Sequence, residues 1–257
     1  MKIARFSAGG ADPAFGILDE ETDELVVLAG DPMFAGYQTT GERVALSGAK
    51  LLAPVIPRSK VISVALNYPI ASDDLPQDER TEPLLLLKPN TSVVGPGDAI
   101  RLPPVEGRIV HEAELAIVIG RIAKQVPGER ALETVFAYTV ANDVTALDLM
   151  LADGQWTRAK GYDTFCPVGP LMETELDTTA LEITASVDGR LRHGGNTRDM
   201  RFSIPDIIAA ASDVWTLLPG DLILTGAPAI GEITAGQSVS VTVEGIGTLT
   251  NPVRAGD

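Results

Sequence analysis

The sequence has few of the residues on which many enzymes rely. Its 257 residues include one cysteine, Cys166, and two histidines, His111 and His193. A single cysteine excludes a disulfide framework and fits a reducing compartment. Two histidines cannot build a three-histidine zinc site. We expect Cys166 to be a small buried residue rather than a nucleophile.

Long apolar runs and common nucleotide-binding loops are also missing. The longest apolar runs, such as LLLL at 84–87, fall far below the roughly 20 residues of a membrane span. No GxxxxGK[ST], GxGxxG or GxSxG pattern occurs. A formal net charge of −15 disfavours nucleic-acid binding. We expect a cytoplasmic protein without a signal peptide that contacts neither membrane nor nucleic acid and acts on a small-molecule substrate.

Short strand-like segments dominate the chain. Residues 1–52 alternate apolar and polar stretches and predict a small β-rich domain, and residues 53–59 form a proline-stiffened linker. Residues 60–257 predict many strands, the clearest at 61–66, 84–87, 113–120, 181–189, 221–226 and 238–249. Helices are expected at 128–136 and, capped by Ser203, at 204–215. This pattern is typical of a mostly β (α+β) protein built on a large mixed sheet or roll.

One polar loop interrupts these strands. Residues 69–83, PIASDDLPQDERTEP, are acidic and framed by prolines. A structureless loop of this length is a candidate lid over a site, and its alternative is a solvated surface loop.

The strongest chemical signal is the segment HEAELAIVIG, residues 111–120. On a strand, Glu112 and Glu114 point to the same face, and a deeply apolar run follows them. Two like charges at the edge of a core repel each other, and a bound cation removes this conflict. An exposed edge strand with both glutamates in water is the alternative. Asp143, which follows the apolar stretch AYTVAN, offers a third carboxylate, and three such ligands suit Mg²⁺, Mn²⁺ or Ca²⁺.

Four stretches then carry a resemblance. In chain order, HEAELAIVIG, AYTVANDV, AKGYDTFCPVGP and LLPGDLILTGAP resemble the fumarylacetoacetate hydrolase superfamily over about residues 60–253. The resemblance implies a rolled, mixed β-sandwich core and a homodimer or higher oligomer. It also implies that Glu112, Glu114 and Asp143 are ligands of Mg²⁺ or Mn²⁺.

The same resemblance assigns further roles. Lys160 falls on the active-site lysine of the family, where its ammonium would stabilise an enolate. Thr225 and Gly226 fall on the segment that holds a substrate carboxylate, and Tyr68 falls among the substrate-contacting positions. Without the family, Lys160 would be an ordinary surface lysine, and Thr225-Gly226 the end of a strand.

Two departures separate this chain from the hydrolases of that superfamily. Their lid histidine, three residues after the tyrosine, is replaced by Ala71, and residues 69–83 contain no histidine. Asp74, Asp73 or His193 is a candidate replacement base, although a solvated carboxylate is a weak base at neutral pH. His111 is a candidate for orienting the glutamates.

The second departure lies after Asp143. Leu147 and Met150 occupy positions where many relatives carry an arginine and a glutamine. Either these residues line a pocket for a less anionic or bulkier substrate, or they pack in the core.

The resulting hypothesis is a divalent-metal-dependent enzyme that acts on a 2-oxo, β-keto or enol substrate through a metal-bound enolate. Decarboxylation or isomerisation is expected, because neither needs an activated water. The alternatives are a C–C hydrolase of the acylpyruvate type that uses Asp74 or His193, an elimination or cyclisation enzyme, and a catalytically silent metal-binding scaffold.

Overall fold

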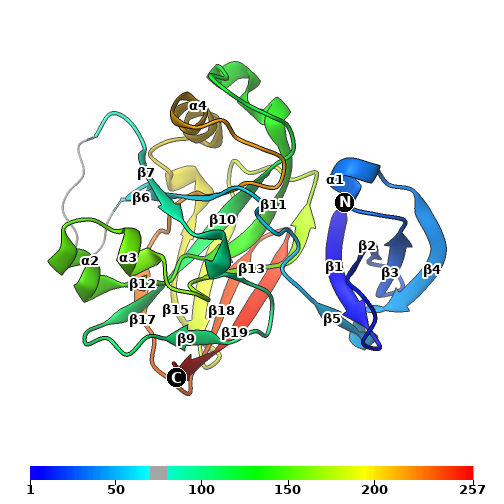
Figure 1. The fold of residues 1–257 in the computed structure, drawn as a ribbon, viewed down its shortest axis with the longest axis horizontal. Coiled ribbons are helices and arrows are strands. Elements are labelled where there is room, and N and C mark those ends of the chain that lie inside the picture. The colour runs from blue at the N-terminus through cyan, green and yellow to red at the C-terminus, as the bar shows by residue number, and fades with distance from the viewer. Residues whose placement is uncertain (70–79, 257) are drawn as a thin grey trace.

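The computed structural model describes residues 1–69 and 80–256, which form two β-sheets and a few short helices (Figure 1). The strands, in chain order, are β1 Lys2–Ala8, β2 Ala14–Asp19, β3 Glu24–Leu28, β4 Thr39–Ala45, β5 Ala49–Leu51, β6 Val61–Ala65, β7 Leu84–Lys88, β8 Val93–Val94, β9 Ile100–Leu102, β10 Ile109–Ile119, β11 Val135–Asn142, β12 Thr145–Ala146, β13 Cys166–Glu173, β14 Glu182–Val187, β15 Arg190–Asn196, β16 Leu222–Leu224, β17 Ile230–Glu232, β18 Ser238–Val243 and β19 Gly247–Ala255. The α-helices are α1 Pro32–Ala35, α2 Leu147–Asp153, α3 Thr157–Lys160 and α4 Ile204–Val214. The 3-10 helices are η1 Leu46–Gly48, η2 Asn90–Ser92, η3 Gly128–Thr134 and η4 Thr197–Asp199. The prediction of a mostly β chain with few helices is confirmed.

The larger sheet runs through the whole molecule. Its strand order in the described residues is β4-β3-β2-β1-β13-β11-β10-β16-β6-β7, with β5, β8, β12 and β17 paired beside this path. The N-terminal segment, residues 1–52, joins this sheet through β1, where Ile3 pairs with Met172 of β13 (Figure 1). The segment therefore extends the sheet of the body sideways.

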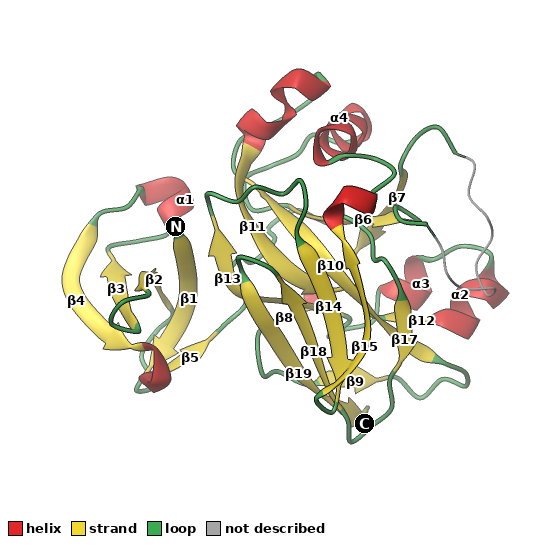
Figure 2. Cartoon of the chain, turned by 180° about the vertical axis from the view of Figure 1, so that it is seen from behind, coloured by secondary structure: helices red, strands yellow, loops and turns green. Residues whose placement is uncertain are grey.

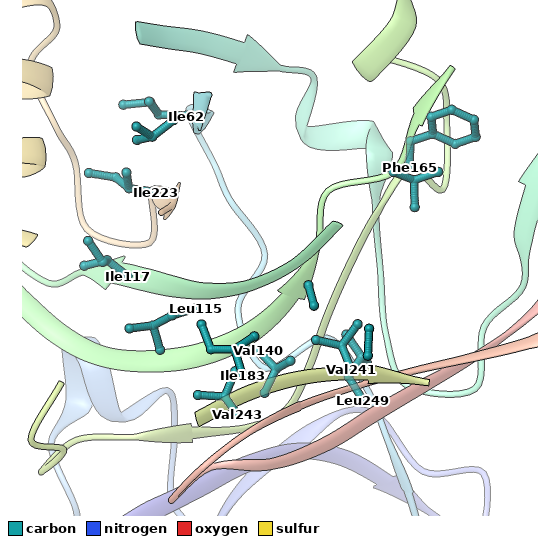
Figure 3. Close-up of a cluster of buried hydrophobic side chains, with 14 of the residues drawn as sticks. Ile62, Leu115, Ile117, Val140, Phe165, Ile183, Ile223, Val241, Val243 and Leu249 are labelled. Carbon is teal, nitrogen blue, oxygen red and sulfur yellow. The ribbon is translucent and has the colours of Figure 1, made fainter. Parts of the chain in front are cut away.

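The smaller sheet packs across β10, β11 and β13 (Figure 2). Its order is β15-β14-β18-β19-β9. Strands β14 and β18 alternate buried and partly exposed residues, as expected when one face covers a core and the other meets water. Figure 3 shows Leu115 and Val140 from the larger sheet meeting Val241, Val243 and Leu249 from the smaller one. This apolar layer fixes β10, and hence the side chains on its other face.

The two predicted helices differ in outcome. Residues 204–214 form α4, and Ser203 and Asp206 make a capping box at its start, as the sequence indicates. The helix predicted at 128–136 is confirmed for residues 128–134, which form the 3-10 helix η3 rather than an α-helix, and its end is wrong, because Val135 begins β11. No side chain caps η3 at Pro127, and β-branched Val135 and aromatic Phe136 favour a strand.

Candidate active site

Strand β10 presents the candidate site at the point where it changes partners. Up to Glu112 it pairs with β12 and β17, and from Ala113 onward it pairs with β11 and then β16. Glu112 and Glu114 lie on either side of this change. Where neighbouring strands diverge, side chains between them are not covered by the next strand, so a pair of carboxylates can be held at the edge of a buried sheet.

Three carboxylates converge here. Oxygen atoms of Glu112, Glu114 and Asp143 all lie within 4.8 Å of one another. The side chains of Glu114 and Asp143 are fully buried, whereas that of Glu112 is 16% exposed and marks the open side. The structure thus brings together the three residues that the sequence predicts as metal ligands.

Two lysines neutralise part of this charge. The Lys160 ammonium donates to Glu112 Oε1 at 2.9 Å, Asp143 Oδ2 at 2.8 Å and Thr145 Oγ1 at 2.8 Å. Buried Lys88 donates to Asp143 Oδ1 at 2.5 Å. Three carboxylates against two ammonium groups leave one negative charge in excess.

That excess falls on Glu114. Its Oε2 accepts the Gly226 backbone N–H at 2.6 Å, but its buried Oε1 has no hydrogen-bond partner among the described residues. Burial, Asp143 and Glu112 raise the pKa of Glu114 well above its usual value. Burial would also raise the pKa of Asp143, but Lys160 and Lys88 overcome it and lower that pKa to about 2. A divalent cation would supply the charge that Glu114 lacks, so the donor set fits Mg²⁺ or Mn²⁺.

A tight turn sets the Gly226 donor. Gly226 has φ +93°, and an added Cβ would lie 2.8 Å from Asn67 Cβ and 3.0 Å from Val64 O. Only glycine fits this approach. The side-chain amide of Asn67 donates to Thr225 O at 2.8 Å. The residue before it, Leu66, has φ +57°. A positive φ at a branched residue is unusual and fits a segment shaped for a site.

Tyr68 contributes an uncommitted hydroxyl beside this turn. The side chain is buried, and its hydroxyl has no hydrogen-bond partner among the described residues. Burial and the nearby charge of Glu114 raise the pKa of Tyr68, so the phenol stays protonated. This hydroxyl can donate to an oxygen of a substrate, and the contact role of Tyr68 stays a prediction.

Four other predicted substrate contacts have different surroundings. The Thr225 hydroxyl donates to Leu115 O at 2.9 Å, and the Gly226 N–H is used by Glu114, so both donors are committed to β10 rather than open to a substrate carboxylate. Leu147 and Met150 are 2% and 3% exposed and pack in the main core cluster. Core packing, the second of the two alternatives, is therefore the position that the structure gives them.

The two histidines lie together, away from the carboxylates. By strand alternation His111 points to the face of β10 opposite Glu112 and Glu114, and it stacks on His193 with ring centroids 4.9 Å apart. Neither ring has a hydrogen-bond partner among the described residues. The structure therefore shows neither the orienting contact considered for His111 nor a base at His193 near the carboxylates. Asp73 and Asp74 lie outside the described residues.

Sequence reasoning missed four polar contributors. Ser63 donates to Asp143 Oδ2 at 2.5 Å and Thr145 to Glu112 Oε1 at 2.5 Å. Asn142 Oδ1 accepts the Glu112 N–H at 3.0 Å, and Lys88 pairs with Asp143. The signal was present for two of them: Ser63 and Lys88 are polar residues within or ending otherwise apolar strands, where a buried polar group needs a partner.

The fold and the site together define a class: a two-sheet β-roll with a carboxylate cluster that could hold a divalent cation. Residues 60–254 match the model of the fumarylacetoacetate (FAA) hydrolase C-terminal family, and residues 1–54 match the Rv2993c-like N-terminal family. This chain therefore belongs to the fumarylacetoacetate hydrolase family. The family expectation from the motifs is confirmed.

Relatives of this chain include enzymes of more than one reaction type. Protein Rv2993c of Mycobacterium tuberculosis is 46% identical over 98% of both chains. The mitochondrial oxaloacetate tautomerase Fahd2a of Rattus norvegicus is 37% identical over 80% of this chain and 70% of its own. Within the described residues, none of the helices has the length and apolar character of a membrane span.

Solved structures agree with this assignment. The 5-carboxymethyl-2-hydroxymuconate delta-isomerase from Mycobacterium smegmatis is 43% identical, with a TM-score of 0.90 over 99% of this chain and all of its own. Maleylpyruvate hydrolase from Sphingobium sp. SYK-6, solved with manganese(II) ion and pyruvate, is 30% identical, with a TM-score of 0.81 over all of both chains. The family thus includes isomerases and hydrolases on one fold.

Proposed function

We propose that this protein is a divalent-metal-dependent isomerase that interconverts the keto and enol forms of a 2-oxo acid, with oxaloacetate the first substrate to test. The observation that supports it most is the composition of the site. Three carboxylates and a protonated lysine surround the open side at Glu112, and both histidines of the chain lie behind β10. The relatives that act as an oxaloacetate tautomerase and a muconate isomerase agree with this choice.

A divalent cation held by Glu112, Glu114 and Asp143 would supply positive charge to the oxygens of a 2-oxo acid. Mg²⁺ and Mn²⁺ are the candidates, because the ligands are oxygens alone. Ser63 and Thr145 donate to the carboxylates of Asp143 and Glu112, and Asn142 holds the backbone of Glu112 through the hydrogen bonds described above. Their role is to keep the ligand oxygens in place without reorganisation.

Lys160 is suited to hold the proton of the reaction. Burial opposes its charge, but Asp143, Glu112 and Glu114 outweigh burial and raise the pKa of Lys160, so Nζ stays protonated. An enolate oxygen near Glu112 would be stabilised by the positive charge of this ammonium. The three N–H groups of Lys160 bond Glu112, Asp143 and Thr145, so donation of a proton to the enolate oxygen would replace one of these bonds. A second group must accept the proton from carbon, and Asp74 remains the hypothesis for that base.

The site supports the other candidate reactions less well. Hydrolysis needs a base to activate water, and neither histidine is near the carboxylates, although a 30%-identical relative is a hydrolase. Decarboxylation needs only enolate stabilisation and remains the second candidate. Elimination, cyclisation and a silent scaffold have no feature of the described residues in their favour.

The test follows the ultraviolet absorbance of enol-oxaloacetate as it relaxes to the keto form, with Mg²⁺, Mn²⁺ or EDTA. Pyruvate release measures decarboxylation in the same samples, and acylpyruvate cleavage measures hydrolysis. We expect metal-dependent tautomerisation that falls about 100-fold or more in Lys160→Met. Lys124→Met, an exposed lysine, is the matched control and should be unchanged. Pyruvate release or acylpyruvate cleavage that outpaces tautomerisation would replace the proposal.

We also propose a homodimer, in keeping with the family resemblance. Light scattering on a size-exclusion column measures the mass directly. A monomer of 27.0 kDa at working concentrations would contradict it.

A further inference from the structure

A pocket of about 320 Å³ lies where the N-terminal segment meets the body of the protein. Its walls come from three parts of the chain: β1 to α1, the linker, and β13 with the Pro219-Gly220 turn. Figure 1 shows the N-terminal segment beside the body, joined to it by the linker. None of the lining residues belongs to the carboxylate–lysine cluster, so this pocket is separate from the candidate active site.

The walls are largely apolar and partly uncovered. Phe15, Met33, Val55 and Met172 line the pocket. Ile56, also in the lining, is 58% exposed. A ligand with an aromatic or alkyl body would remove this apolar surface from water, at about 25 cal/mol per Å² covered. The volume falls within the range of small-molecule sites.

Two guanidinium groups give the pocket a positive charge that the chain as a whole lacks. Arg5 and Arg58 line it against a single carboxylate, Asp31, in a chain with a net charge of −15. Asp31 is already engaged, because its Oδ1 accepts the Met33 N–H at 3.0 Å and caps α1. Among the described residues, no carboxylate lies within 4.0 Å of the nitrogens of either arginine.

Each arginine is held in position. Arg5 projects from β1, its Nη1 lies 3.4 Å from Ala53 O, and burial lowers its pKa despite the charge of Asp31. The Arg58 guanidinium lies 5.2 Å from the centroid of the Phe34 ring, a cation–π distance. Arg5 is partly desolvated and Arg58 is exposed, and each guanidinium can bind a carboxylate through two parallel hydrogen bonds.

From these observations we infer that the pocket binds a small organic anion, with one carboxylate at Arg5 and Arg58 and an aromatic or short alkyl body against the apolar wall. This ligand is distinct from the substrate of the carboxylate–lysine cluster. The inference does not depend on which reaction that cluster catalyses.

Methionine methyl groups provide a site-specific test. Of the five methionines, Met33 and Met172 line the pocket, whereas Met150 lies in α2 and Met200 precedes Arg201. The full-length protein, labelled with ¹³C at the methionine methyls, is titrated with phenylacetate and followed by NMR, and Met→Leu variants assign the signals. We expect saturable shifts of Met33 and Met172, with Met150 and Met200 unmoved. Phenylacetamide, which has the same shape without the charge, should bind at least about tenfold more weakly.

Two variants at exposed positions test the arginine contact without disturbing the core. Arg58→Gln and Ile56→Glu should each weaken phenylacetate binding about tenfold or more. Arg130→Gln is the matched control, because Arg130 is exposed and paired with Glu133, and it should leave the titration unchanged.

Four outcomes would overturn the inference. The first is the absence of a saturable shift at Met33 and Met172 up to about 50 mM phenylacetate, because a dissociation constant above that concentration is too weak to indicate a binding site. The second is equal binding of phenylacetate and phenylacetamide, and the third is equal binding by the two pocket variants and the wild type. The fourth is a shift of Met33 and Met172 with protein concentration alone, which would mean that a second copy of the chain covers this face.

Discussion

The two faces of β10 carry opposite electrostatic arrangements only one residue apart. On one face, Glu112 and Glu114 belong to a cluster of five charged side chains with hydrogen bonds of 2.5–2.9 Å. On the other face, His111 stacks on His193, and neither imidazole has a hydrogen-bond partner among the described residues. Burial disfavours charge on both faces, but on the first face the adjacent lysines keep Asp143 ionised, whereas on the second face burial drives His111 to its neutral form.

This difference shows that burial alone does not decide the state of an ionisable group. Burial raises the pKa of Glu114 and lowers that of His111 to about 4, so both are driven toward their neutral forms. Asp143, equally buried, is held ionised by Lys160 and Lys88. The charges of neighbouring side chains therefore decide whether a buried group is ionised, as Asp143 is, or neutral, as His111 is.

The largest expected effect is on cation binding at the carboxylate face. Glu114→Gln keeps the size of the side chain but removes the excess negative charge. We expect the Mn²⁺ dissociation constant, measured by isothermal titration calorimetry, to rise more than about 100-fold, because changes to residues behind a metal ligand already cost 10- to 100-fold. Glu133→Gln, at an exposed glutamate, is the control. Equal Mn²⁺ affinities in wild type and Glu114→Gln would remove Glu114 from the site.

The next effect concerns the buried lysine of the same face. Lys88→Met leaves Asp143 with one cation fewer in a buried setting, so we expect urea unfolding to show a loss of about 3–5 kcal/mol. Lys124→Met should change the free energy of unfolding by less than about 0.5 kcal/mol. A loss no greater than that of the control would mean that Lys160 alone balances Asp143.

The face of β10 that carries His111 and His193, the histidine face, predicts a pH dependence of stability. The folded state holds His111 neutral to about pH 4, whereas its ordinary pKa is 6.5. The unfolded chain takes up the proton first, so this contribution is complete above pH 6.5 and is lost as the pH falls toward 4. Its size is about 3 kcal/mol, from 1.36 kcal/mol per pKa unit.

Urea unfolding between pH 7 and 4 in EDTA measures this contribution. Burial, then His193 and Arg192, lowers the pKa of His111. His111→Leu removes the titrating group, so its unfolding free energy should fall less steeply on acidification than that of the wild type. Parallel curves for the two proteins would show that His111 takes up its proton over the same pH range in the folded and unfolded states.

The sequence could predict the carboxylate face better than the histidine face. Glu112 and Glu114 share a strand and a period of two, which is a local rule, and the family motifs bring in Asp143 and Lys160. The stacking of His111 on His193 joins β10 to β15 of the smaller sheet, and no local pattern reports which strands of two sheets meet. Strand alternation would have placed His111 on the face opposite the glutamates, but we considered it a candidate for orienting them.

Other differences have equally specific causes. Thr225 and Gly226 were expected to hold a substrate. They follow β16, which pairs with β10, and their donors bond Leu115 and Glu114 of β10 instead. Leu147 and Met150 are apolar, and the short helix α2 turns them into the core, as hydrophobicity alone would suggest. The helix predicted at 128–136 ends two residues early, because pairing of Val135 with Ile119 overrides the local helix preference.

The smallest expected effect is on activity at the histidine face. His193→Gln keeps a polar side chain of similar length, and its position behind β10 predicts tautomerase or other metal-dependent turnover within about twofold of wild type. The stacked ring is lost, so a modest drop in the unfolding midpoint is expected even where turnover is kept. If kcat fell more than about tenfold in a folded, Mn²⁺-binding His193→Gln protein, the imidazole would be reaching the substrate, and the hydrolase alternative that uses His193 as base would take precedence over the isomerase. Only the hydrolase that uses His193 routes a proton through this imidazole, so the comparison tests that alternative, whereas the assay of acylpyruvate cleavage tests a hydrolase that uses Asp74.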